Sequence, residues 1–364
     1  MDKKYLINRR DFLSKSIHLA AGAVVMKQMD IRSILTLAKA DQKIGRICAG
    51  GEGAWFDLKA KPDLNSQTVG SVTRDDIIPW YHTTAANRVD LNSINQRLVE
   101  TEGGFVYAGY VQPVKNILNE PLRELPSYGD KPGMWVEITV PSVDIVKKGP
   151  PGTYWLQHAL KPRLYYGQVF WASEIRTDES NKVQYLLTQR FGAAEEYYWT
   201  PAEACKPITP EDVTPITPEI ENKRVVVNLA RQTLSCFEND REIHFCRVST
   251  GPLLSKGWQT PPGDHPIWRK LFSLHMSAGG GTGEAFDTPA IAWTSLFTTT
   301  GAAIHTSYWH NEYGFARSHG CVNCLPEDAK FVWRWTSPVV PYEPGDLTWN
   351  DWQKGSSRIV VVES

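Results

Sequence analysis

The stretch Ser-His-Gly-Cys-Val-Asn at residues 318–323 is the most informative part of this 364-residue chain. A thiol attacks a carbonyl as the thiolate, so Cys321 needs a base or a cation beside it and room for a substrate. A second histidine, His305, precedes the cysteine in the sequence Ala-Ile-His-Thr. Gly320 lets a backbone approach the thiol closely, and the amides of Gly320 and Cys321 are candidates for binding an oxyanion. The pattern therefore predicts an activated cysteine.

The same stretch resembles the catalytic motif of L,D-transpeptidases of the YkuD type. In that family a histidine is followed, after a loop, by Ser/Thr-His-Gly-Cys, a hydrophobic residue, and Arg or Asn. Two further segments resemble the family. Arg-Val-Val-Val-Asn-Leu at 224–229 is similar to its opening strand, and 248–251 with 260–267 are similar to its STG…TPxGxF segment. The resemblance covers residues 222–364 and implies a β-sandwich catalytic domain with a short helix after the catalytic cysteine.

The resemblance also implies a role for each residue of the motif. Cys321 is the expected nucleophile, and the upstream His305, rather than His319, is the expected base. The backbone carbonyl of Thr306 is expected to orient the His305 ring. The motif residues expected to support the site are Ser318, His319 and Gly320. The residues expected to contact substrate are Tyr308, Trp309, Arg317 and Asn323.

The reaction implied by the family is a 3→3 cross-link in peptidoglycan. The thiolate attacks the third residue of a tetrapeptide stem, D-alanine leaves, and an amine of another stem attacks the thioester. Water as acceptor makes the enzyme an L,D-carboxypeptidase, and a protein amine anchors that protein to the wall. The sequence leaves these acceptors open. The expected partners are stem peptides, and neither a cofactor nor a metal is expected.

Two other classes of function remain open from the sequence. Cys321 and Cys324 form a C-x-x-C pattern, which is typical of redox dithiols and of half a zinc site. No second C-x-x-C follows, although His305, His310 and His319 are further potential zinc ligands. His310 has no motif support and is expected at the surface or at the substrate rim. A non-catalytic wall-binding protein is the other alternative, and the complete catalytic motif argues against it.

Composition and charge narrow the choice further. The net charge is −1 and no basic tract is present, which argues against a nucleic-acid partner because phosphate binding needs clustered Lys and Arg. The chain has six cysteines. With one assigned as nucleophile an odd number remains, so a complete disulfide framework is not implied. Cys236 and Cys246 flank a predicted hairpin, and their pairing stays open.

The N-terminal region is predicted to be an export signal rather than part of the fold. Asn-Arg-Arg-Asp-Phe-Leu at 8–13 resembles the twin-arginine signal, and Ala-Lys-Ala at 38–40 is typical of a cleavage site. The apolar stretch 17–26 is too short to span a bilayer. We therefore expect residues 1–40 to direct export to the cell envelope, either periplasm or wall. No transmembrane segment is expected in the mature chain.

The rest of the chain is predicted to be mainly β, with small SH3-like barrels before the catalytic β-sandwich. Residues 44–115 contain short strands and close on Tyr-Val-Gln-Pro-Val, which resembles the end of bacterial SH3-like domains. Residues 130–208 repeat this ending and predict a second such unit. Four prolines in 207–218 predict an extended linker over residues 209–220. The glycine-rich segment 278–283 is expected to be a lid or a plain surface loop.

Overall fold

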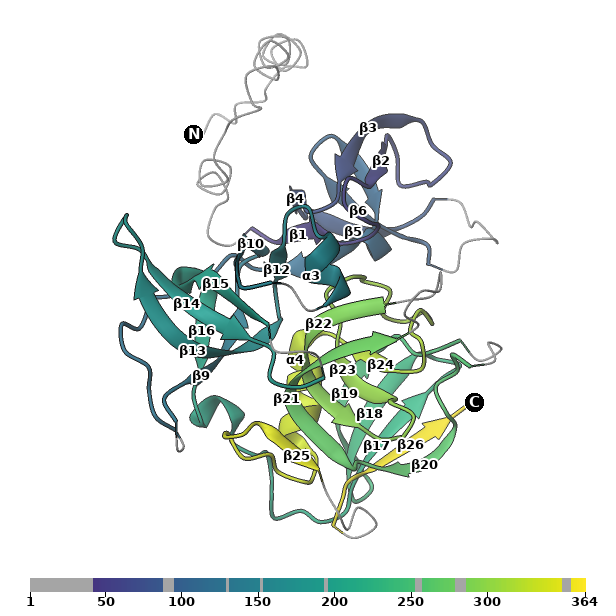
Figure 1. The fold of residues 1–364 in the computed structure, drawn as a ribbon. Coiled ribbons are helices and arrows are strands. Elements are labelled where there is room, and N and C mark those ends of the chain that lie inside the picture. Colours follow the sequence, from purple (N-terminus) through teal and green to yellow (C-terminus); the bar gives the residue numbers. More distant parts are fainter. Residues whose placement is uncertain are drawn as a thin grey trace, which may run out of the picture. The chain divides into compact units, whose positions relative to one another are not determined.

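A computed structural model gives the fold shown in Figure 1. It describes residues 42–87, 95–128, 131–150, 153–192, 196–252, 257–278, 286–348 and 355–364. The predicted export signal and residues 279–283 of the glycine-rich segment lie outside these ranges. No described helix is long and apolar enough to cross a membrane. The strands fall into three successive blocks, and the prediction of a mainly β chain is confirmed.

The first block contains eight short strands in two small sheets. The sheet orders are β4-β1-β8 and β3-β2-β7-β6-β5. Its core is built from aliphatic side chains such as Ile47, Val99 and Val106, all fully buried. The elements are β1 (Ile44–Ile47), β2 (Trp55–Lys59), β3 (Thr68–Thr73), β4 (Ile77–Pro79), β5 (His82–Ala85), β6 (Arg97–Thr101), β7 (Gly104–Tyr107), the 3-10 helix η2 (Ala108–Tyr110) and β8 (Val111–Val114). The SH3-like identity of this block stays a prediction.

The second block repeats the ending of the first, because a one-turn 3-10 helix again leads into a proline-containing final strand. Its main sheet has the order β11-β15-β14-β13-β9-β16, and β10 pairs with β12. The elements are β9 (Met134–Ile138), β10 (Ser142–Asp144), β11 (Val146–Lys148), α3 (Tyr154–His158), β12 (Arg163–Tyr165), β13 (Val169–Thr177), β14 (Val183–Thr188), β15 (Tyr197–Pro201), η3 (Ala202–Ala204) and β16 (Cys205–Ile208).

The third block is a sandwich of two five-stranded sheets, β19-β18-β17-β26-β20 and β24-β23-β22-β21-β25. Alternate residues of β17, such as Val225 and Val227, meet Ile304 and Val322 of the other sheet in one core. The elements are β17 (Lys223–Asn228), β18 (Thr233–Glu238), β19 (Arg241–Arg247), β20 (Gly263–Pro266), β21 (Arg269–Ala278), β22 (Phe286–Leu296), β23 (Ala303–Thr306), β24 (Val322–Cys324), α4 (Pro326–Trp335), β25 (Asp346–Thr348) and β26 (Arg358–Val362).

Helix α4 follows the cysteine motif, as predicted. Pro326 lies at its start, and Glu327 and Asp328 occupy the first turn, where the helix dipole favours acidic groups. Val332 and Trp335 are buried on one face. The helix therefore packs on the core directly behind the strand that carries the motif.

The proline-rich segment 209–220 is not wholly extended, which corrects the expectation of an extended linker. A one-turn 3-10 helix, η4 (Glu211–Val213), interrupts it, and Asp212 accepts a hydrogen bond from the Thr209 amide at 3.0 Å. Val213 and Ile216 pack against the core of the sandwich. Prolines prevent a long helix but leave the aliphatic residues between them free to be buried.

The second block shares its core with the sandwich. Trp135 of β9 stacks on Phe272 of β21 with ring centroids 4.9 Å apart, and it meets Trp171 edge-on at 5.4 Å. Its indole N–H donates to the carbonyl of Tyr342 at 2.9 Å. A Cβ on Gly345 would lie 2.3 Å from the indole ring, so this close approach requires glycine. The two blocks are therefore joined by aromatic packing.

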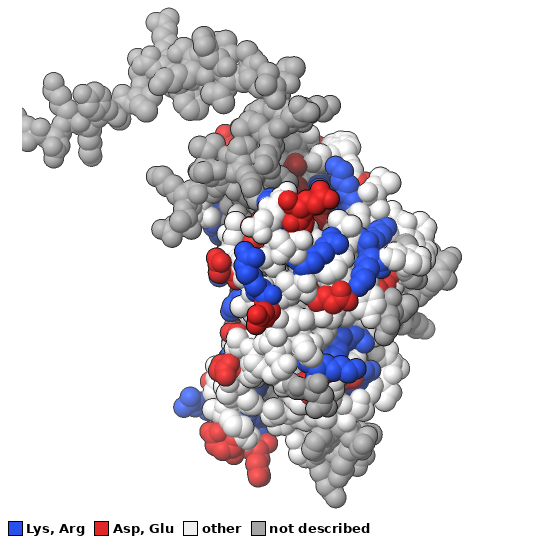
Figure 2. Space-filling view, turned by 60° about the vertical axis from the view of Figure 1, so that its left-hand side comes forward, with Lys and Arg blue, Asp and Glu red and all other residues white. Residues whose placement is uncertain are grey.

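On the described surface shown in Figure 2, basic and acidic side chains are intermixed. This agrees with the net charge of −1.

Candidate active site

The cysteine motif lies where β24 runs parallel to β23. Residue pairs across these strands include His305 with Asn323, so the register brings the upstream histidine beside the motif. Both open onto a cavity of about 1370 Å³. The predicted site residues that line this cavity are His305, Trp309, Arg317, Ser318, His319, Gly320, Cys321 and Asn323. The pairing of β23 with β24 is what brings His305 beside Asn323, 18 positions later in the chain.

A chain of hydrogen bonds assigns the protons of the buried histidines. The Glu312 amide donates to His310 Nδ1 at 3.1 Å, so the proton of that ring is on Nε2, which lies 3.0 Å from Asn323 Oδ1. The Asn323 amide nitrogen, 3.3 Å from His305 Nε2, then donates to it. His305 Nδ1 in turn donates to the Thr306 carbonyl at 2.7 Å, the contact expected from the family resemblance. His305 Nε2 is therefore an unprotonated acceptor.

The pKa values agree with a neutral pair. Burial lowers the pKa of His305 to about 4; the hydrogen bond to Thr306 partly opposes this effect, and the nearby His310 adds to it. Burial raises the pKa of the Cys321 thiol to about 11. At neutral pH the free protein thus holds a thiol and a neutral imidazole. The unprotonated Nε2 of His305 is therefore the candidate base, and the Cys321 thiolate forms when this nitrogen takes up the thiol proton.

The turn before Cys321 is held by Ser318 rather than by His319. The Ser318 hydroxyl donates to the Cys321 carbonyl and accepts from the Gly320 amide at 3.2 Å. That amide is thus already used, which corrects its expected role at an oxyanion. Gly320 has φ +111°, a conformation that favours glycine, while the nearest atom to an added Cβ is 3.6 Å away. Backbone conformation, rather than close approach to the thiol, requires this glycine.

The STG segment supports the motif through backbone contacts. The Thr250 carbonyl accepts from the amides of Arg317 and Ser318 at 3.0 and 3.1 Å. Ser249 exchanges two backbone hydrogen bonds with Asn323, at 2.8 and 3.0 Å. A Cβ on Gly251 would lie 1.8 Å from the Trp258 carbonyl oxygen. The segment that resembles the family in sequence is therefore the frame of the catalytic turn.

Three side chains form the walls of the cavity. The exposed His319 ring lies on Trp258 with centroids 4.1 Å apart, so it shapes the wall through ring packing. Trp309 is half-buried and 6.2 Å from the His305 ring. Arg317 is exposed and also lines a second cavity of about 630 Å³. These positions suit contact with a bound peptide, including its carboxylate.

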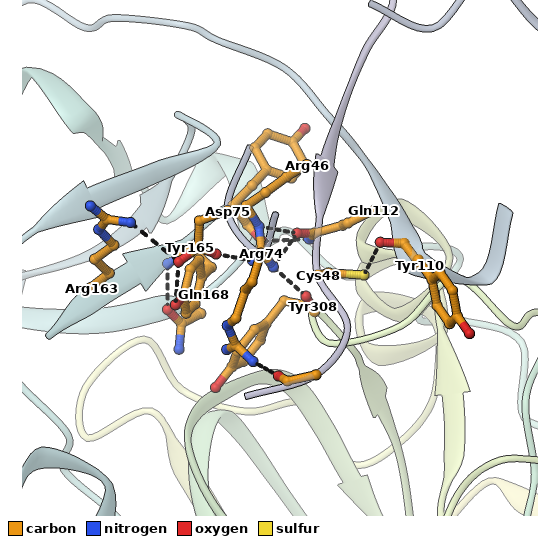
Figure 3. A network of polar contacts seen from close by, with 12 residues as sticks. Arg46, Cys48, Arg74, Asp75, Tyr110, Gln112, Arg163, Tyr165, Gln168 and Tyr308 are labelled. Carbon is orange, nitrogen blue, oxygen red and sulfur yellow. Dashed lines mark hydrogen bonds and ion pairs between the residues drawn. The ribbon is translucent and has the colours of Figure 1, made fainter. Parts of the chain in front are cut away.

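Tyr308 does not line the cavity, contrary to the expected substrate contact. It is buried, stacks on Tyr165 at 5.5 Å, and donates to the Pro289 carbonyl at 3.2 Å. Figure 3 shows Arg46 of β1 beside it. The Arg46 guanidinium donates to the Tyr308 carbonyl at 2.5 Å and to Asp75 at 2.8 Å. Tyr308 therefore anchors the catalytic loop to the first block.

The loop after His305 has further contacts that sequence reasoning missed. His310, expected at the surface or rim, is buried and belongs to the histidine relay. Glu312 is 5% exposed and accepts from Asn95 at 2.7 Å and from the Tyr107 hydroxyl at 3.0 Å. These contacts join residues about 200 positions apart. Nothing in the sequence around Glu312 signals that this acid is buried.

The two cysteines of the C-x-x-C pattern lie in different environments. Cys324 belongs to the large core, whereas Cys321 packs against a separate cluster and opens to the cavity. The zinc set of His305, His310 and His319 with both cysteines is therefore not brought together. All six described cysteines are free, including Cys236 and Cys246 beside the predicted hairpin.

A sequence profile identifies the family of the third block. Residues 222–360 match the sequence profile of the L,D-transpeptidase catalytic domain, YkuD. No protein of curated function matches this chain. Among solved structures, the catalytic domain of an Enterococcus faecium L,D-transpeptidase is 20% identical, with 39% of this chain and 98% of that one covered and a TM-score of 0.29.

Two further solved structures have similar TM-scores. An L,D-transpeptidase from Mycobacterium smegmatis is 15% identical, covers 53% of this chain and 90% of that one, and has a TM-score of 0.31. The Ldtfm–avibactam carbamoyl enzyme is 21% identical, covers 40% of this chain with a TM-score of 0.31, and is matched over 50% of its own length. The assignment rests on the profile match. Residues 222–360 of this chain are an L,D-transpeptidase catalytic domain of the YkuD family.

Proposed function

We propose that this chain forms 3→3 cross-links in peptidoglycan through a thioester on Cys321. The observation that carries the proposal is the relay from His310 through Asn323 to His305, which keeps His305 Nε2 unprotonated in the lining of the cavity that also contains Cys321. The Asn323 amide has to release Nε2 before that nitrogen takes up the thiol proton. The position of the base is set by Thr306 on its other nitrogen. A nucleophile, a base and an orienting group are the set that acyl transfer by a thiol needs.

The proposed reaction proceeds in two halves. Cys321 gives its proton to His305 Nε2, and its sulfur attacks the carbonyl of the third stem residue. The bond to the fourth residue breaks, and the leaving amine takes the proton from the imidazolium. An amine of a second stem then attacks the thioester, with His305 accepting its proton and returning it to the departing sulfur. Water in place of that amine gives the L,D-carboxypeptidase reaction, and a protein amine gives protein attachment to the wall.

The two adjoining cavities suit two stems. Tyr110, Glu312 and Arg317 line both of them. The larger one contains Cys321 and is assigned to the acyl donor. The smaller one is lined by the first block, including Trp55, whose side chain is 66% exposed. An exposed aromatic ring beside polar groups is suited to a peptide or a sugar ring, so the second cavity is assigned to the acceptor strand.

The decisive experiment is acylation by a carbapenem, whose strained β-lactam carbonyl reports an activated thiol without an acceptor. We expect intact-protein mass spectrometry to find one adduct on Cys321, abolished in Cys321→Ala and retained in Cys205→Ala. His305→Ala is expected to slow acylation roughly a hundredfold. Acylation of the Cys321→Ala variant at the wild-type rate contradicts the proposal.

The acceptor assignment has its own measurement. Trp55→Ala is expected to reduce cross-linking of muropeptides severalfold while carbapenem acylation stays unchanged. Equal loss of both reactions, or of neither, contradicts the assignment of the second cavity.

The place of action is proposed to be the cell envelope, reached by the twin-arginine route. The motif at residues 8–13 supports it. Changing Arg9 and Arg10 together to lysine is expected to retain the precursor in the cytoplasm, as cell fractionation would report. Unchanged export of this variant would mean that another route is used.

A further inference from the structure

A cluster of metal-ligating side chains lies outside the catalytic cavity. His244 and Cys246 are alternate residues of β19, so they share one face of the strand, and Asp328 is in the first turn of α4. The ligand atoms of these three side chains all lie within 4.8 Å of one another. None of the three is among the described residues that line the cavity of Cys321. The cluster is therefore a separate site.

A second thiol lies next to Cys246. Cys324, at the end of β24, is fully buried, and the two thiols influence each other's pKa, as neighbouring groups do. The four side chains come from the two sheets of the sandwich and from the helix. Together they supply two sulfur atoms, one imidazole nitrogen and one carboxylate oxygen, which is a donor set that zinc accepts.

The contacts within the cluster are close but incompletely satisfied. His244 Nε2 lies 3.0 Å from Asp328 Oδ1, yet this buried nitrogen makes no aligned hydrogen bond within the described part of the chain. The ring is held by stacking on Phe331 with centroids 4.2 Å apart. A buried ring nitrogen without an aligned partner is uncommon, because its desolvation is then uncompensated. An ion placed between the two donor atoms would satisfy both.

We propose that His244, Cys246 and Asp328 bind one structural zinc ion, with the neighbouring thiol of Cys324 moving in as the fourth ligand. Tetrahedral ligands at zinc are about 3.3–3.8 Å apart, so closure from the present spacing needs a contraction of about 1 Å. Both thiols lose their protons to solvent on binding, and no electron is transferred. The partly exposed edges of His244 and Asp328, with side chains 21% and 15% exposed, give the ion a route of entry.

The site has a structural consequence for catalysis. Cys324 pairs with Thr306 across the parallel strands and directly follows Asn323 of the histidine relay. A zinc ion would tie this strand to β19 and to the start of α4. It therefore acts as a clamp behind the catalytic turn, while Cys321 itself stays free to react.

The test uses the full chain in a Cys321→Ala background, so that zinc bound at the catalytic thiol does not contribute. After incubation with ZnCl₂ and gel filtration, we expect elemental analysis to find about one zinc ion per chain. Asp328→Asn and Cys246→Ser are each expected to lower this content at least tenfold. Glu327→Gln is the matched control, because it removes a neighbouring exposed acid from the same helix turn and is expected to keep the zinc.

Folding of each variant is checked by near-ultraviolet circular dichroism, and Asp328→Asn preserves the shape of the side chain. Zinc content unaffected by Asp328→Asn and Cys246→Ser overturns the proposal, as does absence of zinc from the parent chain. An air-oxidised protein that lacks zinc and carries a Cys246–Cys324 disulfide, seen by peptide mapping, overturns it as well.

Discussion

The catalytic sandwich meets its two neighbouring blocks in different ways. Against the second block, Trp135 packs between Phe272 and Trp171 in a continuous aromatic core. Against the first block, the contacts are buried and polar, as in the pairs Arg46–Tyr308 and Asn95–Glu312. Apolar burial is non-directional and mainly stabilises, whereas buried hydrogen bonds are satisfied in one geometry only. The second block should thus set stability, and the first should set the position of the catalytic loop.

Truncation tests this difference most severely. A chain that begins at residue 220 exposes the aromatic face of the sandwich, and we expect it to be insoluble or unfolded. A chain that begins at residue 131 keeps the shared core, so it should fold but acylate slowly because the loop loses Arg46. Soluble yield, thermal unfolding and carbapenem acylation distinguish the two. An active, soluble chain from residue 220 would show that the second block is a separable module.

Replacing Trp135 by alanine removes the centre of the apolar contact. We expect the free energy of unfolding to fall by about 3–5 kcal/mol, the usual range for a buried tryptophan. Urea titration measures the change. Leu160→Ala is the matched control, since that side chain is 86% exposed and its loss should cost less than about 0.5 kcal/mol. Equal effects for both variants would contradict a shared core.

Acid is expected to lower the stability of the folded chain through the buried His305. The folded-state pKa of His305, about 4, is below its ordinary value of 6.5, so the unfolded chain binds more protons between these values. Stability is therefore full above pH 6.5 and falls as the pH drops toward 4, by about 3 kcal/mol from this group. Urea titrations at several pH values measure this slope. His305→Gln should flatten it, and an unchanged slope in that variant would assign the acid sensitivity to other groups, such as His310.

Arg46→Lys probes a single polar contact. The ammonium keeps the charge but cannot reach Asp75, Gln112 and the Tyr308 carbonyl together, as the guanidinium does. We expect the free energy of unfolding to fall by about 1–2 kcal/mol. The acylation rate should fall roughly tenfold, because an increase of about 1.4 kcal/mol in the activation free energy lowers a rate by that factor. Arg176→Lys on the exposed part of β13 should change neither. A stability loss without any rate change would remove the positioning role of Arg46.

Sequence reasoning was accurate where the chemistry is local. The family resemblance of the motif from Ser318 to Asn323 predicted a short helix after the cysteine, and α4 is that helix. It failed where partners are far apart in the chain. His310 carries no motif, and its role depends on Asn323, which reaches it only because β23 and β24 are parallel. The expectation of an extended linker failed for a similar reason, because Val213 and Ile216 pack against the core of the sandwich and the Thr214 carbonyl accepts a hydrogen bond from Arg334, 120 positions later.

The sequence by itself determined the family of the catalytic domain, the mainly β character of the chain and the identity of the motif residues. Those features depend on residue type and short spacing, which any conformation of the chain preserves. The folded structure was needed to find which neighbour each surface meets, which nitrogen of His305 carries no proton, and that Tyr308 contacts Arg46 instead of the cavity. Burial and hydrogen-bond geometry depend on distances between segments remote in sequence, and these distances exist only once the chain has folded.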